Sequence, residues 1–420
     1  MTQAPIIHAL AAASLLLAAC GDSASQAPPA PIPPGPVIQQ VRDVLARDEA
    51  RWIAFRRDLH RNPELSGAEV RTAAAVANEM RLLGLEVRTG VGGHGVVATL
   101  RGARPGPLVA YRADMDAVQS SAPDPVDFRS TTSGVRHICG HDIHTAVAVA
   151  LAGALSQVRD SLAGSVLFVF QPAEENATGA RAMLADGVFS AATPVAIYGV
   201  HTAPFEQGRL ATTPGPMMAG VDRFDVAIAG SGDLSAATSL AVQRISALAT
   251  IDASQIGVSQ PPDFVLVRLD APQVSAGEVR LRGTAMVAAA DARARVREAI
   301  TTGLQAAMPA GVRVTATYEA RTIAGVTNDS TLTEGAVAAL RTTLGAPAVA
   351  TVTTIPPAFS EDFGSFQERV PGVFFYLGVS NSARGWNGLP HSADYVADEA
   401  AITTGALAMA AVILDRLTRP

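Results

Sequence analysis

The sequence contains no lysine, so all 32 basic residues in this chain of 420 are arginine. Only 5% of the residues are aromatic, and the two cysteines, Cys20 and Cys139, cannot form a multi-disulfide framework. The net charge of −6 argues against a nucleic-acid-binding surface, which is normally basic. No apolar run reaches the roughly 20 residues needed to cross a bilayer. The length and the 48% hydrophobic content instead indicate two or three globular domains.

The N-terminal region has the features of an export signal. Residues 9–19 form an apolar stretch that is too short to span a membrane but suits the core of a signal peptide. It ends in LAAC, which resembles the lipobox of bacterial lipoproteins, although the first basic residue is Arg42. The Pro- and Ala-rich residues 21–37 predict an extended tether. We therefore expect residues 1–20 to be a lipoprotein-type signal peptide. Lipidated Cys20 would tether the protein to a bacterial membrane on its extracytoplasmic, periplasmic side; the alternative is an ordinary signal peptide.

The rest of the chain alternates helical and strand patterns. Apolar spacing predicts helices at residues 37–60, 68–83, 145–158, 332–344 and 399–417. Short apolar runs predict strands at residues 95–100, 108–111, 165–170, 195–200 and 373–377. This alternation is typical of an α/β layered domain.

A different pattern interrupts this domain. Its expected elements lie at residues 222–229, 234–248, 264–270, 278–287, 292–307 and 312–318. Their order, β-α-β-β-α-β, predicts a ferredoxin-like α+β domain. We expect residues 38–216 and 323–420 to form the two parts of the catalytic domain, with residues 217–322 inserted between them.

Side chains that bind metals gather near the predicted strand ends. Residues 137–144 read HICGHDIH, with three histidines, one cysteine and one aspartate. Glu174 and Glu175 follow the strand VLFVF, His201 ends the strand AIYGV, and His391 lies in GLPHSADY. Ligands of open α/β sheets bind at strand ends, so we expect these side chains to converge.

These residue types are suited to metal-assisted hydrolysis. Thiolate and imidazole suit Zn²⁺ and similar ions, and a carboxylate adds a hard ligand. Of two adjacent glutamates, one can bind metal while the other takes a proton from a metal-activated water. A single loop histidine is usually solvated, and a Glu-Glu pair usually lies on the surface. The combination of all these residues at strand ends favours a metal site.

The sequence resembles the aminoacylase, hippurate hydrolase and auxin-conjugate hydrolase family of dinuclear metallopeptidases. Seven stretches match in the family's order: RRDLHRNPELSGAE, YRADMDAV, HICGHDIHTA, QPAEEN, YGVHTAPFEQG, FSEDFGSF and GLPHSADY. The resemblance implies a layered α/β metallopeptidase domain interrupted by a smaller ferredoxin-like lid that also forms a homodimer.

The resemblance also implies residue roles. Two divalent ions (Zn, Mn, Co or Ni) would be bound by Cys139, His141, Glu175, His201 and His391. Glu174 would be the general base, and Asp116 would orient a ligating histidine. We expect a metal-dependent amidohydrolase that cleaves N-acyl amino acids or related small amides. The alternatives are a dipeptidase or carboxypeptidase of the same family, and a lipid-tethered metal-binding protein without turnover.

The expected lid departs from the family's pattern. The family's lid carries a histidine that polarises the scissile carbonyl, and an asparagine and an arginine that bind the substrate carboxylate. Residues 217–320 contain neither histidine nor asparagine. Met286 stands where the arginine is expected, although Arg282 is close in sequence. We therefore expect an active enzyme with altered specificity.

Overall fold

The computed structural model describes residues 35–357 and 359–419, so the predicted signal peptide, Cys20 and most of the predicted tether lie outside the described residues. The described chain divides into two compact units. The larger comprises residues 35–217, 323–352 and 361–419, and the smaller comprises residues 218–322 and 353–360 without residue 358.

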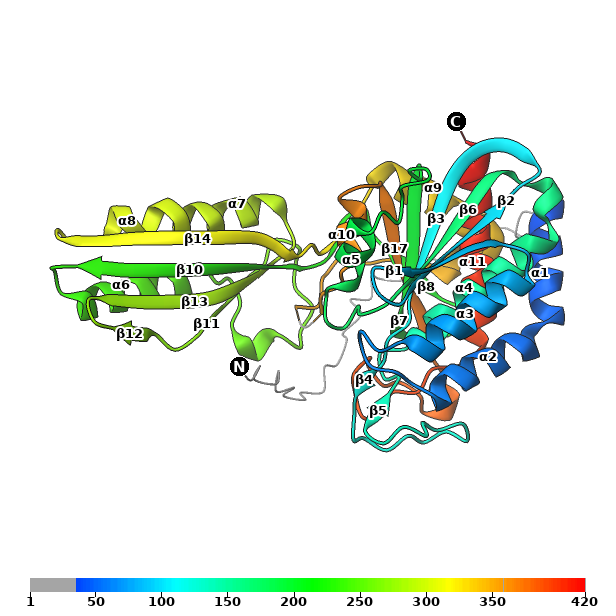
Figure 1. Cartoon of the computed structure of the whole chain (residues 1–420), viewed down its shortest axis with the longest axis horizontal. Helices are drawn as coiled ribbons and strands as arrows, with labels where there is room; N and C mark the ends of the chain where they lie inside the picture. Colours follow the sequence, from blue (N-terminus) through cyan, green and yellow to red (C-terminus); the bar gives the residue numbers. More distant parts are fainter. Residues whose placement is uncertain (1–34, 358, 420) are drawn as a thin grey trace, which may run out of the picture. The chain divides into compact units, whose positions relative to one another are not determined.

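The larger unit is built on an eight-stranded mixed sheet in the order β1-β2-β6-β3-β7-β17-β8-β16 (Figure 1). Its strands in that order are β1 (Glu86–Val91), β2 (Gly95–Arg101), β6 (Ala163–Gln171), β3 (Arg104–Asp114), β7 (Ala196–Glu206), β17 (Gly372–Ser380), β8 (Leu210–Thr212) and β16 (Val349–Thr351). The central strands β6, β3, β7 and β17 are parallel. All nine residues of β17 are buried, as expected for a strand covered on both faces.

Helices α4 and α11 pack against each other and against the central strands (Figure 1). The helices of this unit are α1 (Pro36–Arg47), α2 (Glu49–Arg61), α3 (Val70–Leu82), α4 (His141–Gln157), α5 (Gly179–Ala185), α9 (Ser330–Leu344), α10 (Gly364–Gln367) and α11 (Ala400–Thr418). By length and composition α11 could cross a membrane, but most of it is buried in the core of this unit. The mixed α/β architecture confirms the predicted fold class.

Some predicted elements differ from the structure. The helix expected at residues 37–60 is broken at Asp48, which ends α1 and begins α2. The side chain of Asp48 does not cap α2 and pairs with Arg47 instead, so the break comes from the separate packing of the apolar stripes of α1 and α2. His201 does not end its strand, because β7 continues to Glu206 and pairs with β17, where Tyr376 lies opposite His201.

The smaller unit follows the order β-α-β-β-α-β with one additional short strand (Figure 1). Its main elements are β10 (Gly220–Gly230), α6 (Leu234–Ser246), β11 (Val265–Leu269), β12 (Gln273–Ser275), β13 (Glu278–Val287), α7 (Ala290–Glu298), α8 (Leu304–Ala307) and β14 (Val312–Ile323). The sheet order is β11-β13-β10-β14. On β10 the residues Phe224, Val226 and Ile228 are buried in the core shared with the helices, whereas Arg223 is exposed on the other face. A π-helical turn separates α7 from α8, where the sequence predicted one helix.

Candidate metal centre

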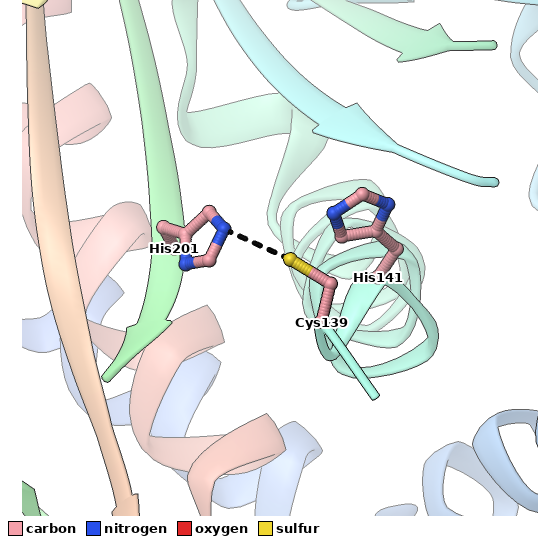
Figure 2. A group of neighbouring side chains, drawn as sticks. All are labelled: Cys139, His141 and His201. Atoms are coloured by element: carbon pink, nitrogen blue, oxygen red, sulfur yellow. Dashed lines mark hydrogen bonds between the residues drawn. The ribbon is translucent and has the colours of Figure 1, made fainter. Parts of the chain in front are cut away.

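The start of α4 carries the first two predicted ligands. Cys139 and His141 flank Gly140, whose φ of 92° lies in the left-handed region. A Cβ on Gly140 would overlap Oη of Tyr395 and Oγ1 of Thr202, so only glycine fits this turn. The turn brings Cys139 and His141 together at the beginning of the helix (Figure 2).

His201 approaches these two residues from β7. Its Nε2 lies 3.3 Å from Sγ of Cys139 (Figure 2). Its Nδ1 lies 2.8 Å from the backbone carbonyl of Thr202, so Nδ1 donates and Nε2 keeps its lone pair. Cys139, His141 and His201 each offer a ligand atom within 4.8 Å of the others.

Cys139 also belongs to a second group of potential ligands. Cys139, Glu175 and His391 offer ligand atoms within 4.8 Å of one another. Nε2 of His391 lies 3.1 Å from Oε1 of Glu175. The backbone of His391 has a left-handed φ of 67°, and its N–H donates to the carbonyl of Ile138 at 2.8 Å. That bond holds the His391 loop beside the segment that carries Cys139.

The two groups fit a pair of metal ions that share one sulfur ligand. The donors are one thiol, three imidazoles and one carboxylate, a set that suits Zn²⁺ and similar divalent ions. Nε2 of His141 is buried and has no hydrogen-bond partner among the described residues. An unpartnered buried nitrogen of this kind is rare in a protein interior, and a bound cation would satisfy it. The five predicted ligand residues therefore lie together, in an arrangement that suits two ions.

Asp116 lies behind His141. Its Oδ1 is 3.2 Å from Nδ1 of His141. Its Oδ2 accepts hydrogen bonds from Oγ of Ser66 at 2.6 Å and from the backbone N–H of Glu175 at 3.0 Å. One buried carboxylate thus links the helix start to the segment that carries the two glutamates. This contact to a histidine is the one expected for Asp116.

Glu174 and Glu175 are adjacent, but their pKa values are shifted in opposite directions. Oε2 of Glu174 lies 3.9 Å from Nε2 of His141. Burial, followed by the charge of Glu361, raises the pKa of Glu174 well above its usual range. Burial acts in the same direction on Glu175, but the hydrogen bond and charge of His391 together with the charge of His141 and the hydrogen bond from Cys139 outweigh it and lower the pKa of Glu175 to about 2. These opposite shifts suit Glu174 as a base and Glu175 as a metal ligand.

Carboxylates dominate the electrostatics of the cluster. Burial and the charges of Glu175 and Glu174 raise the pKa of the Cys139 thiol well above its usual range. Burial alone would lower the pKa of His141, but the carboxylates of Asp114, Asp116 and Glu175 together outweigh it and raise that pKa to about 10. A bound divalent cation would reverse both shifts, because it displaces protons from its ligands.

The other histidines of HICGHDIH lie outside both ligand groups. Nδ1 of His144 is 2.6 Å from Oδ1 of Asp114, and its Nε2 accepts the backbone N–H of Thr202 at 2.8 Å. Both ring nitrogens of His144 are therefore occupied. His137 is buried with no hydrogen-bond partner among the described residues, and burial lowers its pKa to about 4.

A buried charge cluster next to Glu174 was not singled out as functional from the sequence. Arg112 on β3 is fully buried and contacts Asp114 at 2.7 Å and Glu361 at 2.8 Å. Its Nη2 also lies 3.3 Å from Oδ1 of Asp362. The sequence signal was an arginine inside the apolar run LVAYRADM, because a buried charge needs partners. Carboxylate oxygens of Glu174, Glu361 and Asp362 lie within 4.8 Å of one another.

Comparisons with known proteins identify the family of this chain. Residues 110–415 match the family described as Peptidase family M20/M25/M40. Over 393 residues the chain is 30% identical to thermostable carboxypeptidase 2 of Saccharolobus solfataricus. This alignment covers 89% of this chain and 97% of that protein. Over 389 residues it is 32% identical to N-acetylcysteine deacetylase of Bacillus subtilis. This alignment covers 87% of this chain and 98% of that protein.

A solved structure has the same fold. The Bacillus subtilis YXEP protein, described as a dinuclear metal binding peptidase from the M20 family, matches with a TM-score of 0.73 and 29% identity. The match covers 89% of this chain and 99% of that one. The resemblance found in the sequence is confirmed: this chain belongs to the M20/M25/M40 peptidase family and is a metal-dependent hydrolase with a dinuclear metal site.

Proposed function

We propose that this protein is an amidohydrolase that cleaves the amide bond of N-acyl amino acids or related small amides. The observation that carries the proposal is the position of Glu174, a buried carboxylate with a raised pKa, beside two ligand groups that share Cys139. The similarity to the N-acetylcysteine deacetylase of Bacillus subtilis supports an acylated amino acid as substrate.

The proposed mechanism divides the work among neighbouring residues. Two divalent ions (Zn, Mn, Co or Ni) would be held by Cys139, His141, Glu175, His201 and His391. Such ions make water more acidic and polarise a carbonyl. Glu174 accepts the proton of the attacking water and returns it to the leaving amine, a role for which its raised proton affinity suits it. Asp116 keeps the His141 ring oriented.

The substrate preference that we propose rests on the residues of the smaller unit. The sequence predicts that it lacks the residues that bind a substrate carboxylate and polarise the scissile carbonyl. Its remaining candidate, Arg282, is about half exposed and its Nε lies 2.9 Å from Oδ2 of Asp225. Because a neighbouring carboxylate already pairs with Arg282, this arginine is a poor substitute for a free carboxylate-binding group. We infer a preference for bulky, apolar amides.

A substrate panel with metal-loaded full-length protein tests the function. N-acyl amino acids, their amides and dipeptides would be assayed with Zn, Mn, Co or Ni, with Glu174→Gln as the inactive control. Release of free amine that requires both metal and Glu174 supports the proposal. Metal binding without turnover of any panel member would instead favour a non-catalytic metal-binding protein.

A carboxypeptidase or dipeptidase is the second candidate. It is favoured by the similarity to thermostable carboxypeptidase 2 of Saccharolobus solfataricus. The same panel separates the candidates, because a carboxypeptidase cleaves peptides with a free C-terminus faster than N-acetyl amino acids. A preference for dipeptides in kcat/KM would replace the first proposal.

We also propose a membrane-tethered, extracytoplasmic location and a homodimer. The first rests on the LAAC sequence and the Pro-rich segment after it. The second rests on the family resemblance of the inserted domain. Mass spectrometry of the native N-terminus would detect acylated Cys20, and an unmodified or uncleaved N-terminus would reject the tether. Sedimentation of the detergent-solubilised protein would measure its oligomeric state.

A further inference from the structure

The segment Pro172–Gly179, here called the base loop, carries both Glu174 and Glu175. It connects the end of β6 to the start of α5. Two of its alanines have left-handed backbones, with φ values of 53° at Ala173 and 52° at Ala177. A residue with a Cβ is unfavourable in this region, so the loop needs contacts that keep it there.

One side chain from a distant part of the chain binds both ends of the base loop. Oδ1 of Asp362 accepts a hydrogen bond at 2.7 Å from Nε2 of Gln171, the residue before the loop. Oδ2 of Asp362 accepts a hydrogen bond at 3.0 Å from the backbone N–H of Ala180, the residue after it. Asp362 therefore joins the two ends through its two carboxylate oxygens.

Arg112 fixes this carboxylate in the interior. Asp362 is only 1% exposed, so its charge needs a partner. Nη2 of Arg112 lies 3.3 Å from Oδ1 of Asp362, and Nε of Arg112 donates to Oε1 of Gln171 at 2.8 Å. The Gln171 amide is thus held by Arg112 at its oxygen and by Asp362 at its nitrogen, which leaves it one orientation.

The middle of the base loop is held separately. Oε1 of Glu69 accepts the backbone N–H of Ala173 at 2.8 Å. The N–H of Gly179 donates to the carbonyl of Ala173 at 3.1 Å, and a Cβ on Gly179 would overlap the carbonyl of Pro172. Oδ2 of Asp116 also accepts the backbone N–H of Glu175 at 3.0 Å. The loop closes tightly on itself, and the contacts of Asp362 add the attachment at its two ends.

We propose that Asp362 is a positioning residue that holds the base loop, and with it Glu174, in place for catalysis. The proposal rests on the proposed function, because it assigns Glu174 as the base. Asp362 is assigned no contact with substrate in this scheme. Its carboxylate lies within 4.8 Å of the Glu174 carboxylate, as does that of Glu361, so the hydrogen bonds to the two ends of the loop are what distinguish Asp362 from Glu361. A shift of about 1 Å in a catalytic group can cost about a hundredfold in rate.

Asp362→Asn tests the positioning role with almost no change in size. An amide has one oxygen, so in either orientation its NH₂ faces the N–H of Ala180 or the NH₂ of Gln171. Glu361→Gln is the matched control, because Glu361 also contacts Arg112 but binds neither end of the loop. Gln171→Ala, which releases one end only, serves if Asp362→Asn does not fold.

The first measurement is hydrogen exchange by mass spectrometry on the metal-loaded full-length protein. We expect exchange in peptides covering residues 172–180 to rise about tenfold in Asp362→Asn or Gln171→Ala and to stay near the wild-type rate in Glu361→Gln. Unchanged exchange in the loop, or an equal rise throughout the protein, would overturn the proposal. This result decides the role of Asp362 even if no substrate is found for the wild type.

The second measurement is the kinetics of the best substrate, with a rescue. Asp362→Asn should lower kcat about a hundredfold and change KM by less than about threefold. Adding Ala177→Gly removes the unfavourable left-handed alanine and should restore kcat several-fold, whereas Ala177→Gly alone should leave it nearly unchanged. Failure of the rescue, or a loss confined to KM, would contradict the proposal.

Discussion

Oδ1 of Asp116 lies 3.2 Å from Nδ1 of His141, while Nε2 of the same ring is buried without a hydrogen-bond partner among the described residues. The carboxylate accepts a hydrogen bond from Nδ1–H, and in the metal-bound form this keeps the Nε2 lone pair available for the ion. A neutral imidazole held in this way is the form that binds a metal.

Asp116→Asn should therefore weaken metal binding. The amide oxygen can still accept from His141, but its NH₂ would then face the backbone N–H of Glu175, which also donates. Loss of such a contact typically costs about 10–100-fold in metal affinity. Competition with a chromogenic chelator measures the change. Ser66→Ala, which removes the other hydrogen bond to the same carboxylate, is the milder control, and an equal loss in both variants would contradict the orienting role.

Glu174→Gln and Glu175→Gln should separate base from ligand. Glutamine at position 174 keeps the shape but cannot accept the proton, so hydrolysis should fall by about 10²–10⁴-fold while two metals remain bound. Glutamine at position 175 should lower the metal content first. Metal analysis and kcat on the same preparations measure both effects. If both variants lose metal equally and activity in proportion, the division of roles is wrong.

Cys139→Ser should affect both metal positions at once, because Cys139 belongs to both ligand groups. A hydroxyl is a much poorer ligand than a thiolate. With cobalt as a probe, the variant should lose the sulfur-to-cobalt absorption and bind fewer than two ions per chain. Thr202→Ser, which keeps a hydroxyl next to Cys139, is the control. Two cobalt ions bound at unchanged affinity in the serine variant would reject a shared sulfur ligand.

The site was partly readable from the sequence because its chemistry is concentrated in short segments. Cys139 and His141 sit two residues apart, and Glu174 and Glu175 are adjacent, so their proximity required no tertiary knowledge. His201 and His391 could be added because both occur in stretches that resemble the family's motifs. The strand-end argument was less reliable, since β7 continues for five residues beyond His201.

The supporting contacts could not be read in the same way. Asp362 and Ala180 are 182 residues apart, and no local pattern indicates that their atoms meet. The break at Asp48 depends on how α1 and α2 each bury an apolar stripe, which propensity alone does not resolve. The short strands β8 and β16 span three residues each and gain their pairing only from the assembled sheet. Tertiary contacts decided these features.

The stability of the protein should depend on pH through Asp124. Burial alone would raise the pKa of Asp124. The hydrogen bonds from His60 and from the backbone N–H of Ser130, together with the charges of His60 and Arg136, outweigh burial and lower the pKa to about 2. The pKa of His60 is raised, because its bonds to Asp124 and Asp142 outweigh its burial. The contribution of Asp124 is therefore present above the ordinary aspartate pKa of about 4 and is lost as pH falls through about 2.

Asp124→Asn should destabilise the metal-free protein by about 1–3 kcal/mol between pH 5 and 6, and by little near pH 2. Urea unfolding in the presence of a chelator measures the difference without interference from metal loss. Asp58→Asn is the control: it breaks a half-exposed ion pair with Arg71 and should cost less than about 1 kcal/mol. A difference between wild type and Asp124→Asn that is independent of pH would contradict the assigned charge interaction.

The substrate preference gives the last prediction. A site built to pair a carboxylate rejects analogues that lack it, and without that pairing the preference should relax. The predicted lid has Met286 where the family has an arginine, and Arg282 is already paired with Asp225. We therefore expect an N-acyl amino acid and its own amide to have similar kcat/KM. Among the amides, we expect the highest kcat/KM for bulky, apolar ones.

The comparison should be made on wild type and on Arg282→Gln. If Arg282 does not bind substrate, its replacement should leave the ratio of acid to amide unchanged. A preference for the free acid above about a hundredfold, equivalent to about 2.7 kcal/mol, would mean that some group still binds the carboxylate. Loss of that preference in Arg282→Gln would identify Arg282 as the group. Loss of the ion pair with Asp225 by itself should affect the acid and the amide equally.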